Sequence, residues 1–375
     1  MPPIWKLQRE WDRLGQMARS IVAYPFEGIL QVAYDRKFPR QISVTNGDCA
    51  AMEKVVIFLI FQPKEILAST LRECRHLIDN GFAPLVISNC PLTEASRAEL
   101  KQVSWKIAER PNYGYDFGGY RDGVRLLDHW NILPSALLIL NDSIWFPLHN
   151  KSVVLDKLQA KDTNVAGIFY HEDLVRRSTF STRKAFLESY LYIFDKEALA
   201  SEAFKKYWKK YRVSSNKLNA VYRGERALCD AMRAGGLSVE GLIDRRVFLE
   251  CLSSQSALFL RKTLEYAAYT DTDFAEAGEQ LLADYASTPA WSNRAKEHIS
   301  KVTKKRNLHA SFCFASMTLF GIASIKKSQG TFLKKSYGTL HTESRTQYLR
   351  ALAAGDLPKA FPEIVAEIQA RQTAI

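Results

Sequence analysis

The chain has 375 residues, of which 47% are hydrophobic and 25% are charged. These values are ordinary for a globular protein and exclude a disordered or fibrous chain, and the length allows one large domain or two. The formal net charge of +12 is unusual. It favours an anionic partner such as a nucleotide, a phosphorylated lipid, a membrane surface or nucleic acid. A basic protein without such a partner is the alternative.

The cysteines and the N-terminus indicate where the protein works. None of the six cysteines forms a C-x-x-C pair, so zinc and thioredoxin-like sites have no support. Several lie in apolar runs, a usage typical of a reducing compartment. Charged residues between Lys6 and Arg13 interrupt the N-terminus, so no signal peptide is predicted. The least polar stretch, 310–325, is shorter than the roughly 20 residues of a membrane span. We therefore expect a cytoplasmic protein.

The first half of the chain alternates between two periodicities. Residues 1–46 are expected to be peripheral, with a helix from Trp5 to Ile21. After that, strands are expected at Val55–Phe61, Pro84–Ser88, Trp105–Ala108 and Ala136–Leu140. Helices are expected between them, over 67–78 with Gly81 at the C-terminal cap, over Thr93–Val103 and around Tyr120, Val124 and Leu127. This alternation predicts an α/β fold with a mainly parallel sheet and right-handed connections.

The second half is less regular. Strands are expected at Val165–Phe169 and Ser189–Phe194, followed by a helix from Lys196 to Arg212. The stretch from about 266 to 375 is expected to be mostly helical, with a loop from Ser328 to Thr342. We predict three parts: a peripheral segment 1–46, an α/β domain 47–250 and a helical extension 251–375.

Parallel sheets bind ligands beyond the carboxyl ends of their strands. Four segments should meet at that edge: Gln62-Pro63, Ser88-Asn89, Asn112 to Gly119 and Asn141-Asp142-Ser143. Asn112 to Tyr120 is neither a G-x-G-x-x-G fingerprint nor a P-loop. Its glycines can let backbone approach a ligand, and Asp116 can cap a helix or bind a ribose hydroxyl. A tight turn with glycines chosen for packing is the other interpretation, and both stay open.

Asp142 is the candidate metal ligand, because a carboxylate at a strand end can hold Mg²⁺ or Mn²⁺ against a diphosphate. A polar strand end that caps the next turn is the alternative. The other candidate acids lie near predicted element ends, where a general base for a hydroxyl acceptor is wanted. They are Glu172 and Asp173 beside His171, Glu188 and Glu225.

Two features of the sequence are compatible with contact between the protein and a membrane surface. An aromatic stripe runs through Phe204, Tyr207, Trp208 and Tyr211, with lysines at 205, 206, 209 and 210, and it indicates either an interfacial helix or, preferably, a core-facing one. Basic clusters lie at Lys304-Lys305-Arg306, Lys326-Lys327 and Lys334-Lys335. Together with the net charge they predict peripheral contact with an anionic membrane.

The motifs resemble those of the rhamnan synthesis protein F family of bacterial polysaccharide glycosyltransferases. The family segment N-x-G-x-D-F-G-x-Y is matched by Asn112, Gly114, Asp116, Phe117, Gly118 and Tyr120. The family's N-D-S strand end, followed by G-P-L, corresponds to Asn141-Asp142-Ser143 and to 146–148, with Phe146 in place of glycine. Glu188 to Phe194 is similar to Q-S-Y-F-L-V-F, with glutamate in place of glutamine. Looser matches follow at 204–208 and 222–228, and the resemblance spans roughly 50 to 245.

The resemblance implies a glycosyltransferase type A-like fold in which an acid motif meets the nucleotide-sugar, usually through a metal. It implies transfer of a deoxyhexose, with rhamnose favoured, to a hydroxyl of a surface polysaccharide such as O-antigen or of its lipid-linked precursor at the inner face of the membrane. The donor favoured is dTDP-rhamnose, with UDP- or GDP-sugars as alternatives. The donor-binding residues implied by the motifs are Asn112, Gly114, Asp116, Gly118, Gly119, Tyr120, Asn141, Asp142 and Ser143. Gln62 and Asn89 are added to them from their expected place at the same edge of the sheet.

Two other functions compete with this one. A non-catalytic module that binds nucleotide-sugar or glycan is supported by the single acid of the N-D-S motif. A nucleic-acid-binding protein is suggested by charge alone, and because no helix-turn-helix, RRM or zinc pattern accompanies that charge, nucleic acid is not expected as a partner.

Overall fold

The structure is a computed structural model that describes residues 26–171, 174–175, 182–183, 185–328 and 335–373. The chain divides into two compact units. The first comprises Met1–Asp142, Gln159–Gly167 and Asp173–Gly241, and the second comprises Ser143–Leu158, Ile168–Glu172 and Leu242–Ile375. The expected helix at Trp5 to Ile21 lies outside the described residues, as do Glu172 and Asp173.

Four parallel strands form the centre of the first unit. They are β2 (Lys54–Ile60), β3 (Phe82–Ser88), β4 (Lys106–Glu109) and β5 (Ala136–Asn141). Their order in the sheet is β4-β3-β2-β5, and each neighbouring pair is parallel. Nearly every residue of β2, β3 and β5 is buried, as their continuous apolar sequences require for strands covered on both faces. The four strands expected in this half are confirmed, with ends shifted by one or two residues.

Further strands extend the sheet on both sides, and β1 and β11 are antiparallel to their neighbours. β1 (Ser43–Asn46) pairs with β4, and β11 (Leu191–Asp195) lies between β5 and β7 (Val165–His171). β10 (Phe186–Leu187) and β12 (Val239–Ile243) pair with β7. β8 (Leu174–Val175) and β9 (Thr182–Arg183) form a separate antiparallel pair. The expected mainly parallel sheet is thus a mixed sheet with a parallel centre.

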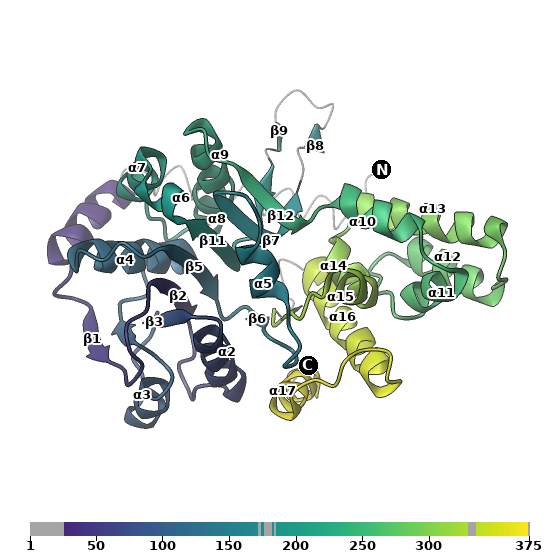
Figure 1. The fold of residues 1–375 in the computed structure, drawn as a ribbon, viewed down its shortest axis with the longest axis horizontal. Helices are drawn as coiled ribbons and strands as arrows, with labels where there is room; N and C mark the ends of the chain where they lie inside the picture. The colour runs from purple at the N-terminus through teal and green to yellow at the C-terminus, as the bar shows by residue number, and fades with distance from the viewer. Residues whose placement is uncertain (1–25, 172–173, 176–181, 184, 329–334, 374–375) are drawn as a thin grey trace. The chain divides into compact units, whose positions relative to one another are not determined.

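Helices cover both faces of these central strands (Figure 1). α2 (Ala68–Asp79) and α3 (Glu94–Lys101) lie on one face and α4 (Tyr115–His129) on the other. The chain runs from β2 outward through β3 to β4, and α4 then returns it to β5 on the far side of β2. A right-handed connection that reverses direction in this way must cross the opposite face.

Packing explains the glycines at the start of α4. Gly114 precedes the helix with φ 85°, and a Cβ there would lie 2.1 Å from Cγ1 of Val213. A Cβ on Gly118 would lie 2.1 Å from the carbonyl oxygen of Tyr113, and one on Gly119 would lie 2.3 Å from Cδ1 of Leu59. Protein atoms fill the space beside all three glycines. Packing therefore accounts for glycine at all three positions, and their part in donor binding stays a prediction.

The helical stretch expected from Lys196 to Arg212 is two helices, α6 (Lys196–Ala200) and α7 (Glu202–Lys210). The break falls at Ser201, whose backbone is extended and whose hydroxyl accepts a hydrogen bond from the Phe204 N–H, capping α7. The aromatic stripe of α7 is buried and its lysines are exposed, so the core-facing interpretation is confirmed. The unit ends with α8 (Lys217–Val221), a π-helical turn (Tyr222–Arg226) and α9 (Ala227–Ala234).

The second unit is mostly helical, as expected. Its helices are α5 (Val154–Gln159), α10 (Arg245–Ser253), α11 (Ala257–Glu265), α12 (Thr272–Ala283), α13 (Pro289–Lys305), α14 (Leu308–Ser311), α15 (Cys313–Phe320), α16 (Lys335–Ala353) and α17 (Pro362–Thr373). A short antiparallel pair joins β6 (Ile144–Trp145) to β13 (Ile325–Lys326). Trp145, Phe314, Tyr348 and Ile364 share one apolar core.

The loop expected from Ser328 to Thr342 is wrong from Lys335 onward, where α16 begins. Serine, glycine and threonine in this stretch are poor helix formers, which is why the sequence favoured a loop. Leu340, however, is buried with Ala268 and Ala310. Such tertiary packing outweighs weak intrinsic propensity. Within the described residues, no helix is long and apolar enough to cross a membrane.

Residues 26–37 form a helix that an ion pair attaches to α4. Asp35 accepts two hydrogen bonds from Arg121, at 2.7 and 2.8 Å, and one from Arg125 at 2.6 Å. Burial alone would raise the pKa of Asp35, but the two guanidinium groups outweigh burial and lower it. The ion pair therefore favours the folded state whenever Asp35 is ionised.

Our first prediction concerns Gly118. Gly118→Ala should lower the free energy of unfolding by about 1–3 kcal/mol, because the new methyl group meets a backbone carbonyl that cannot move aside alone. Urea denaturation followed by circular dichroism measures the change. Asp128→Ala, on the exposed side of the same helix, is the control and should change stability by less than about 0.5 kcal/mol. Equal stability of the two variants would contradict the packing role.

Our second prediction concerns pH. Because the folded-state pKa of Asp35 is lowered, its contribution is fully present above its unfolded pKa of about 3.9 and is lost as pH falls through the folded value. Asp35→Asn should therefore destabilise the protein at pH 7 by about 1–3 kcal/mol. The difference from wild type should shrink below about pH 4. Denaturant titrations of both proteins at several pH values provide the measurement, and a difference independent of pH would rule out the ion pair as its cause.

Candidate active site

The candidate site lies where the strand order of the first unit reverses. The chain moves from β2 outward to β4 and returns to β5 on the other side of β2, so β2 and β5 flank the topological switch point. Open α/β sheets bind their ligands in the crevice beyond the carboxyl ends of such strands. Phe61 and Gln62 follow β2 there, and Asp142 follows β5.

Asp142 is held by the end of the neighbouring strand. Its Oδ2 atom accepts hydrogen bonds from the backbone N–H of Phe61 and from Nε2 of Gln62, each at 3.0 Å. Its own N–H donates to the carbonyl oxygen of Leu59 at 3.0 Å. Oδ1 accepts no hydrogen bond from any residue that the structure describes. One carboxylate oxygen thus fixes the side chain, and the other is available to a ligand.

Gln62 is the residue that orients Asp142. It is buried, and its Nε2 donates both to Asp142 and to the Thr70 hydroxyl, while its Oε1 accepts from the Leu67 N–H at the start of α2. The sequence placed Gln62 at this edge, but only the structure joins it to Asp142. A buried amide with all these partners has one orientation, so the carboxylate beside it has one as well.

Asn141 and Asp116 also meet at this edge. Asn141 is buried at the end of β5, and its Nδ2 donates to Oδ2 of Asp116 at 3.2 Å. Asp116 lies in the first turn of α4, where its charge is favourable near the positive end of the helix dipole. It does not act as the N-cap, a position that Gly114 occupies. Two of the motifs chosen from the sequence are therefore brought together.

Arg110 is a residue that sequence analysis missed. It forms an ion pair with Asp122 at 2.7 Å, and both side chains are almost fully buried. It also donates to Oδ1 of Asn89 and, at 2.7 Å, to the carbonyl oxygen of Tyr113. Arg110 therefore holds the glycine turn against the end of β3. An arginine directly after a buried strand and an aspartate inside the next helix were the only traces of this pair in the sequence.

Tyr120 and Glu225 meet at Ser189. The Tyr120 hydroxyl donates to the Ser189 carbonyl oxygen at 3.0 Å, and Oε1 of Glu225 accepts from both the N–H and the hydroxyl of Ser189. Burial, and next the charge of Asp116, raise the pKa of Tyr120 well above its usual value, so it remains a proton donor. Glu225 lies on the π-helical turn, a feature often found at functional sites.

The remaining candidates are more scattered. Asn112 is exposed in the turn before α4, and Glu188 is half-buried beside Ser189. Ser143 and His171 belong to the second unit. Glu172 and Asp173 lie outside the described residues.

A divalent cation fits this site only if the ligand supplies most of the coordination. Among the residues that the structure describes, no group of three or more His, Cys, Asp and Glu side chains could hold a metal. Magnesium sites that act on phosphates commonly use one or two carboxylates together with phosphate oxygens and water. Asp142, with a free Oδ1, and Asp116 are the acids of this edge that match that donor set.

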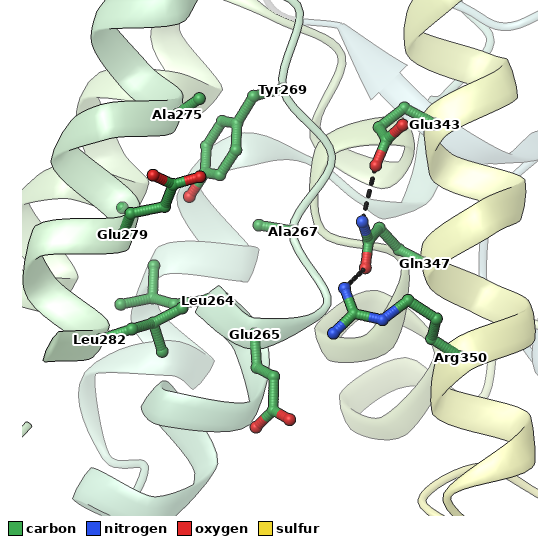
Figure 2. A pocket seen from close by; sticks show the side chains of 11 residues that line it. Leu264, Glu265, Ala267, Tyr269, Ala275, Glu279, Leu282, Glu343, Gln347 and Arg350 are labelled. Atoms are coloured by element: carbon green, nitrogen blue, oxygen red, sulfur yellow. Dashed lines mark hydrogen bonds between the residues drawn. The ribbon is translucent and has the colours of Figure 1, made fainter.

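A separate cavity lies within the second unit (Figure 2). It has a volume of about 300 Å³ and is lined by residues of α11, α12 and α16 and of the segment after α11. On α16, Gln347 donates to Glu343 at 2.6 Å and accepts from Arg350 at 2.7 Å. Across the cavity stand Tyr269 and Glu279. Sequence analysis selected none of these residues.

Comparison with known proteins confirms the resemblance seen in the motifs. The model of the family described as rhamnan synthesis protein F matches residues 85–259. This range contains the glycine turn, the N-D-S strand end and Glu225. The mixed, mainly parallel sheet flanked by helices agrees with the expected glycosyltransferase type A-like architecture. The match supports a glycosyltransferase of polysaccharide biosynthesis.

The protein is also similar to individual chains. An uncharacterized protein of Sinorhizobium fredii, y4gN, is 29% identical over 261 residues, which cover 70% of this chain and 67% of that one.

Among solved structures, the mannosyltransferase PcManGT from Pyrobaculum calidifontis, in complex with GDP-Man and Mn²⁺, is 9% identical with a TM-score of 0.32, covering 90% of this chain and 97% of that one. The glycosyltransferase GlyE of Streptococcus pneumoniae is also 9% identical with a TM-score of 0.32, over 84% and 66% of the two chains. Likeness at this level carries no argument about substrate.

Our third prediction concerns Gln62. Gln62→Ala should destabilise the protein by about 1–3 kcal/mol, because the buried Thr70 hydroxyl and the Leu67 N–H lose their partner. Thermal denaturation measures this loss. Gln102→Ala, at an exposed position after α3, removes the same side chain and should be neutral. If Gln62→Ala were equally neutral, the hydrogen bonds would not hold the end of β2.

Proposed function

We propose that this protein is a glycosyltransferase that moves a deoxyhexose, most simply rhamnose, from a nucleoside diphosphate donor to a glycan hydroxyl. The acceptor is a bacterial surface polysaccharide or its lipid-linked precursor. The observation that carries the proposal is Asp142 at the switch point of the sheet, with one carboxylate oxygen fixed by the end of β2 and the other free. The family match over the same region supports it.

The donor half of the site follows from this arrangement. Asp142 and Asp116 are the acids that would hold Mg²⁺ or Mn²⁺ against the diphosphate, where the cation would neutralise charge on the leaving group. Asn141 and Gln62 orient these acids. We favour dTDP-rhamnose as the donor, because the matching family is described by rhamnan synthesis, with UDP- and GDP-sugars as alternatives.

The acceptor half needs a base if the sugar's configuration inverts. Glu225 is the strongest of the predicted bases, because it lies on a π-helical turn and shares Ser189 with Tyr120. Glu188 neighbours the same serine. Glu172 and Asp173 remain candidates on the sequence alone. Charge development at the sugar resembles an oxocarbenium ion, as in glycoside hydrolysis.

A non-catalytic nucleotide-sugar or glycan-binding module is the second candidate. It is favoured by one observation, that the described residues contain no cluster of three metal-ligating side chains. Such a module would bind donor with no turnover. Release of free nucleoside diphosphate from the donor, in the presence and absence of acceptor, separates the two functions.

A peripheral position at the inner face of the membrane suits a lipid-linked acceptor. The net charge of +12 supports it, since each Lys or Arg near an anionic surface contributes about 1 kcal/mol. Lys205, Lys206, Lys209 and Lys210 are exposed and can take part.

Our fourth prediction tests the donor site. dTDP, UDP or GDP should raise the melting temperature of the wild-type protein, because a ligand that binds only the folded state stabilises it. Asp142→Asn keeps an oxygen to accept the Phe61 and Gln62 hydrogen bonds, so it should fold normally. Its turnover should fall by at least about 10²-fold, which corresponds to roughly 2.7 kcal/mol.

The control for this prediction is Asp128→Asn, which removes the same charge on the exposed side of α4. It should retain wild-type turnover. Absence of binding by all three nucleotides at millimolar concentration would eliminate the proposed activity. If Asp142→Asn kept full turnover, Asp142 would have only a structural role at the end of the strand.

A further inference from the structure

The cavity of the second unit is lined by residues of that unit alone (Figure 2). α11, α12 and the segment that follows α11 form one wall, and α16 forms the other. The volume of about 300 Å³ lies at the lower end of the range for small-ligand sites, which is about 300–1,000 Å³. The proposed donor site uses no residue of this lining, so the cavity is unassigned by the function proposed above.

The wall formed by α16 presents a connected row of polar side chains to the cavity. Arg350 donates to Oε1 of Gln347 at 2.7 Å, and Nε2 of Gln347 donates to Oε1 of Glu343 at 2.6 Å. Gln347 is buried, so these two hydrogen bonds fix the orientation of its amide. The two ends of the row can still serve a ligand, because a guanidinium has five N–H donors and a carboxylate accepts at both oxygens.

The opposite wall contains a tyrosine ring that its neighbours hold in place. The Tyr269 hydroxyl and Nε2 of His298 form a hydrogen bond at 3.0 Å. Burial, and next the charge of Lys301, lower the pKa of His298, and burial raises the pKa of Tyr269, so neither ring is charged at neutral pH. A Cβ on Gly278 would lie 2.8 Å from the Tyr269 hydroxyl oxygen, because α12 packs directly against the ring. Tyr269 therefore provides a fixed, neutral aromatic surface.

The rest of the lining combines apolar surface with further carboxylates. Leu264 and Leu282 provide the apolar surface, and Glu265 and Glu279 provide hydrogen-bond acceptors. Together with Glu343, three carboxylates and one guanidinium line the space. Among the residues that the structure describes, no group of three or more acidic, histidine or cysteine side chains could hold a metal ion. The three glutamates are therefore spread around the cavity and not gathered at one point.

We propose that this cavity binds one sugar unit of a glycan. A hydroxyl group both donates and accepts hydrogen bonds, so sugar hydroxyls can donate to the glutamates and accept from Arg350. The C–H groups of a sugar ring suit the apolar side chains and the Tyr269 ring. Ions fit less well, because three carboxylates repel an anion and Arg350 repels a cation. That this glycan is the acceptor rests on the proposed function.

The test measures binding of L-rhamnose, D-mannose and D-glucose to the full chain by ligand-observed NMR titration. Ala275→Leu fills the cavity without a change of charge, because Ala275 lines it from α12. Ala277→Leu adds the same side chain at an exposed position of the same helix and is the control. At least one sugar should bind the wild type and the control with affinities equal within about twofold. Ala275→Leu should bind that sugar at least about tenfold more weakly.

A second pair of variants tests the polar lining and decides the question if Ala275→Leu does not fold. Glu279→Gln removes a carboxylate from the lining, and Glu276→Gln removes one from an exposed position of the same helix. Hydrogen bonds to charged groups are stronger than those to neutral groups, so Glu279→Gln should weaken sugar binding by about threefold or more. Glu276→Gln should leave it unchanged. Putrescine, a diamine, should not displace the sugar.

Three outcomes overturn the inference: no sugar bound by the wild type at millimolar concentration, equal sugar affinity of each folded variant and its control, or displacement of the sugar by putrescine. All three are distinguishable from failure of the proposed function. If nucleoside diphosphates stabilise the protein and no sugar binds, the donor site stands and the cavity site is eliminated. If sugar binds through the cavity and no nucleotide binds, the cavity site stands, the donor is eliminated and a glycan-binding module remains.

Discussion

The parallel pairing of β2 with β5 is the constraint on which the candidate site depends. Both strands are apolar and buried, so their register is fixed by packing, with Leu59 opposite Asn141. That register places Asp142 beside the first backbone N–H groups beyond β2. The carboxylate can then accept hydrogen bonds from Phe61 and Gln62 while one oxygen remains free. A shift of one residue would remove both contacts and turn the side chain to the other face.

Around this pair, the rest of the first unit keeps the edge in place. Arg110, paired with Asp122, ties the turn before α4 to the end of β3, and the glycines allow that turn to pack without a gap. Breaking a buried ion pair by removing one partner typically costs about 3–5 kcal/mol. The site is therefore supported by groups that need not touch a ligand themselves, which is how a rigid scaffold positions a small number of reacting atoms.

The positively charged side chains of the protein lie in two kinds of environment. The lysines of α7 are in water, whereas Lys327 and Arg345 of the second unit are buried. Solvated lysines cost little and support solubility or a membrane surface. Buried cations are expensive and are kept where an anion or a fixed geometry repays the cost. The structure thus places these cations in two environments, solvent for the lysines of α7 and the protein interior for Lys327 and Arg345.

The sequence by itself determined the alternation of strands and helices, the mainly parallel sheet and the edge at which Gln62, Asn89, Asp116 and Asp142 gather. It could do so because continuous apolar runs and glycine turns are local patterns whose spacing limits the topology. Tertiary structure alone decided that a Cβ on Gly118 would meet the Tyr113 carbonyl oxygen, that residues from Lys335 onward are helical, and that Gln62 donates a hydrogen bond to Asp142. It also decided which cations are buried. These features depend on contacts between residues far apart in the chain, and no local pattern encodes them.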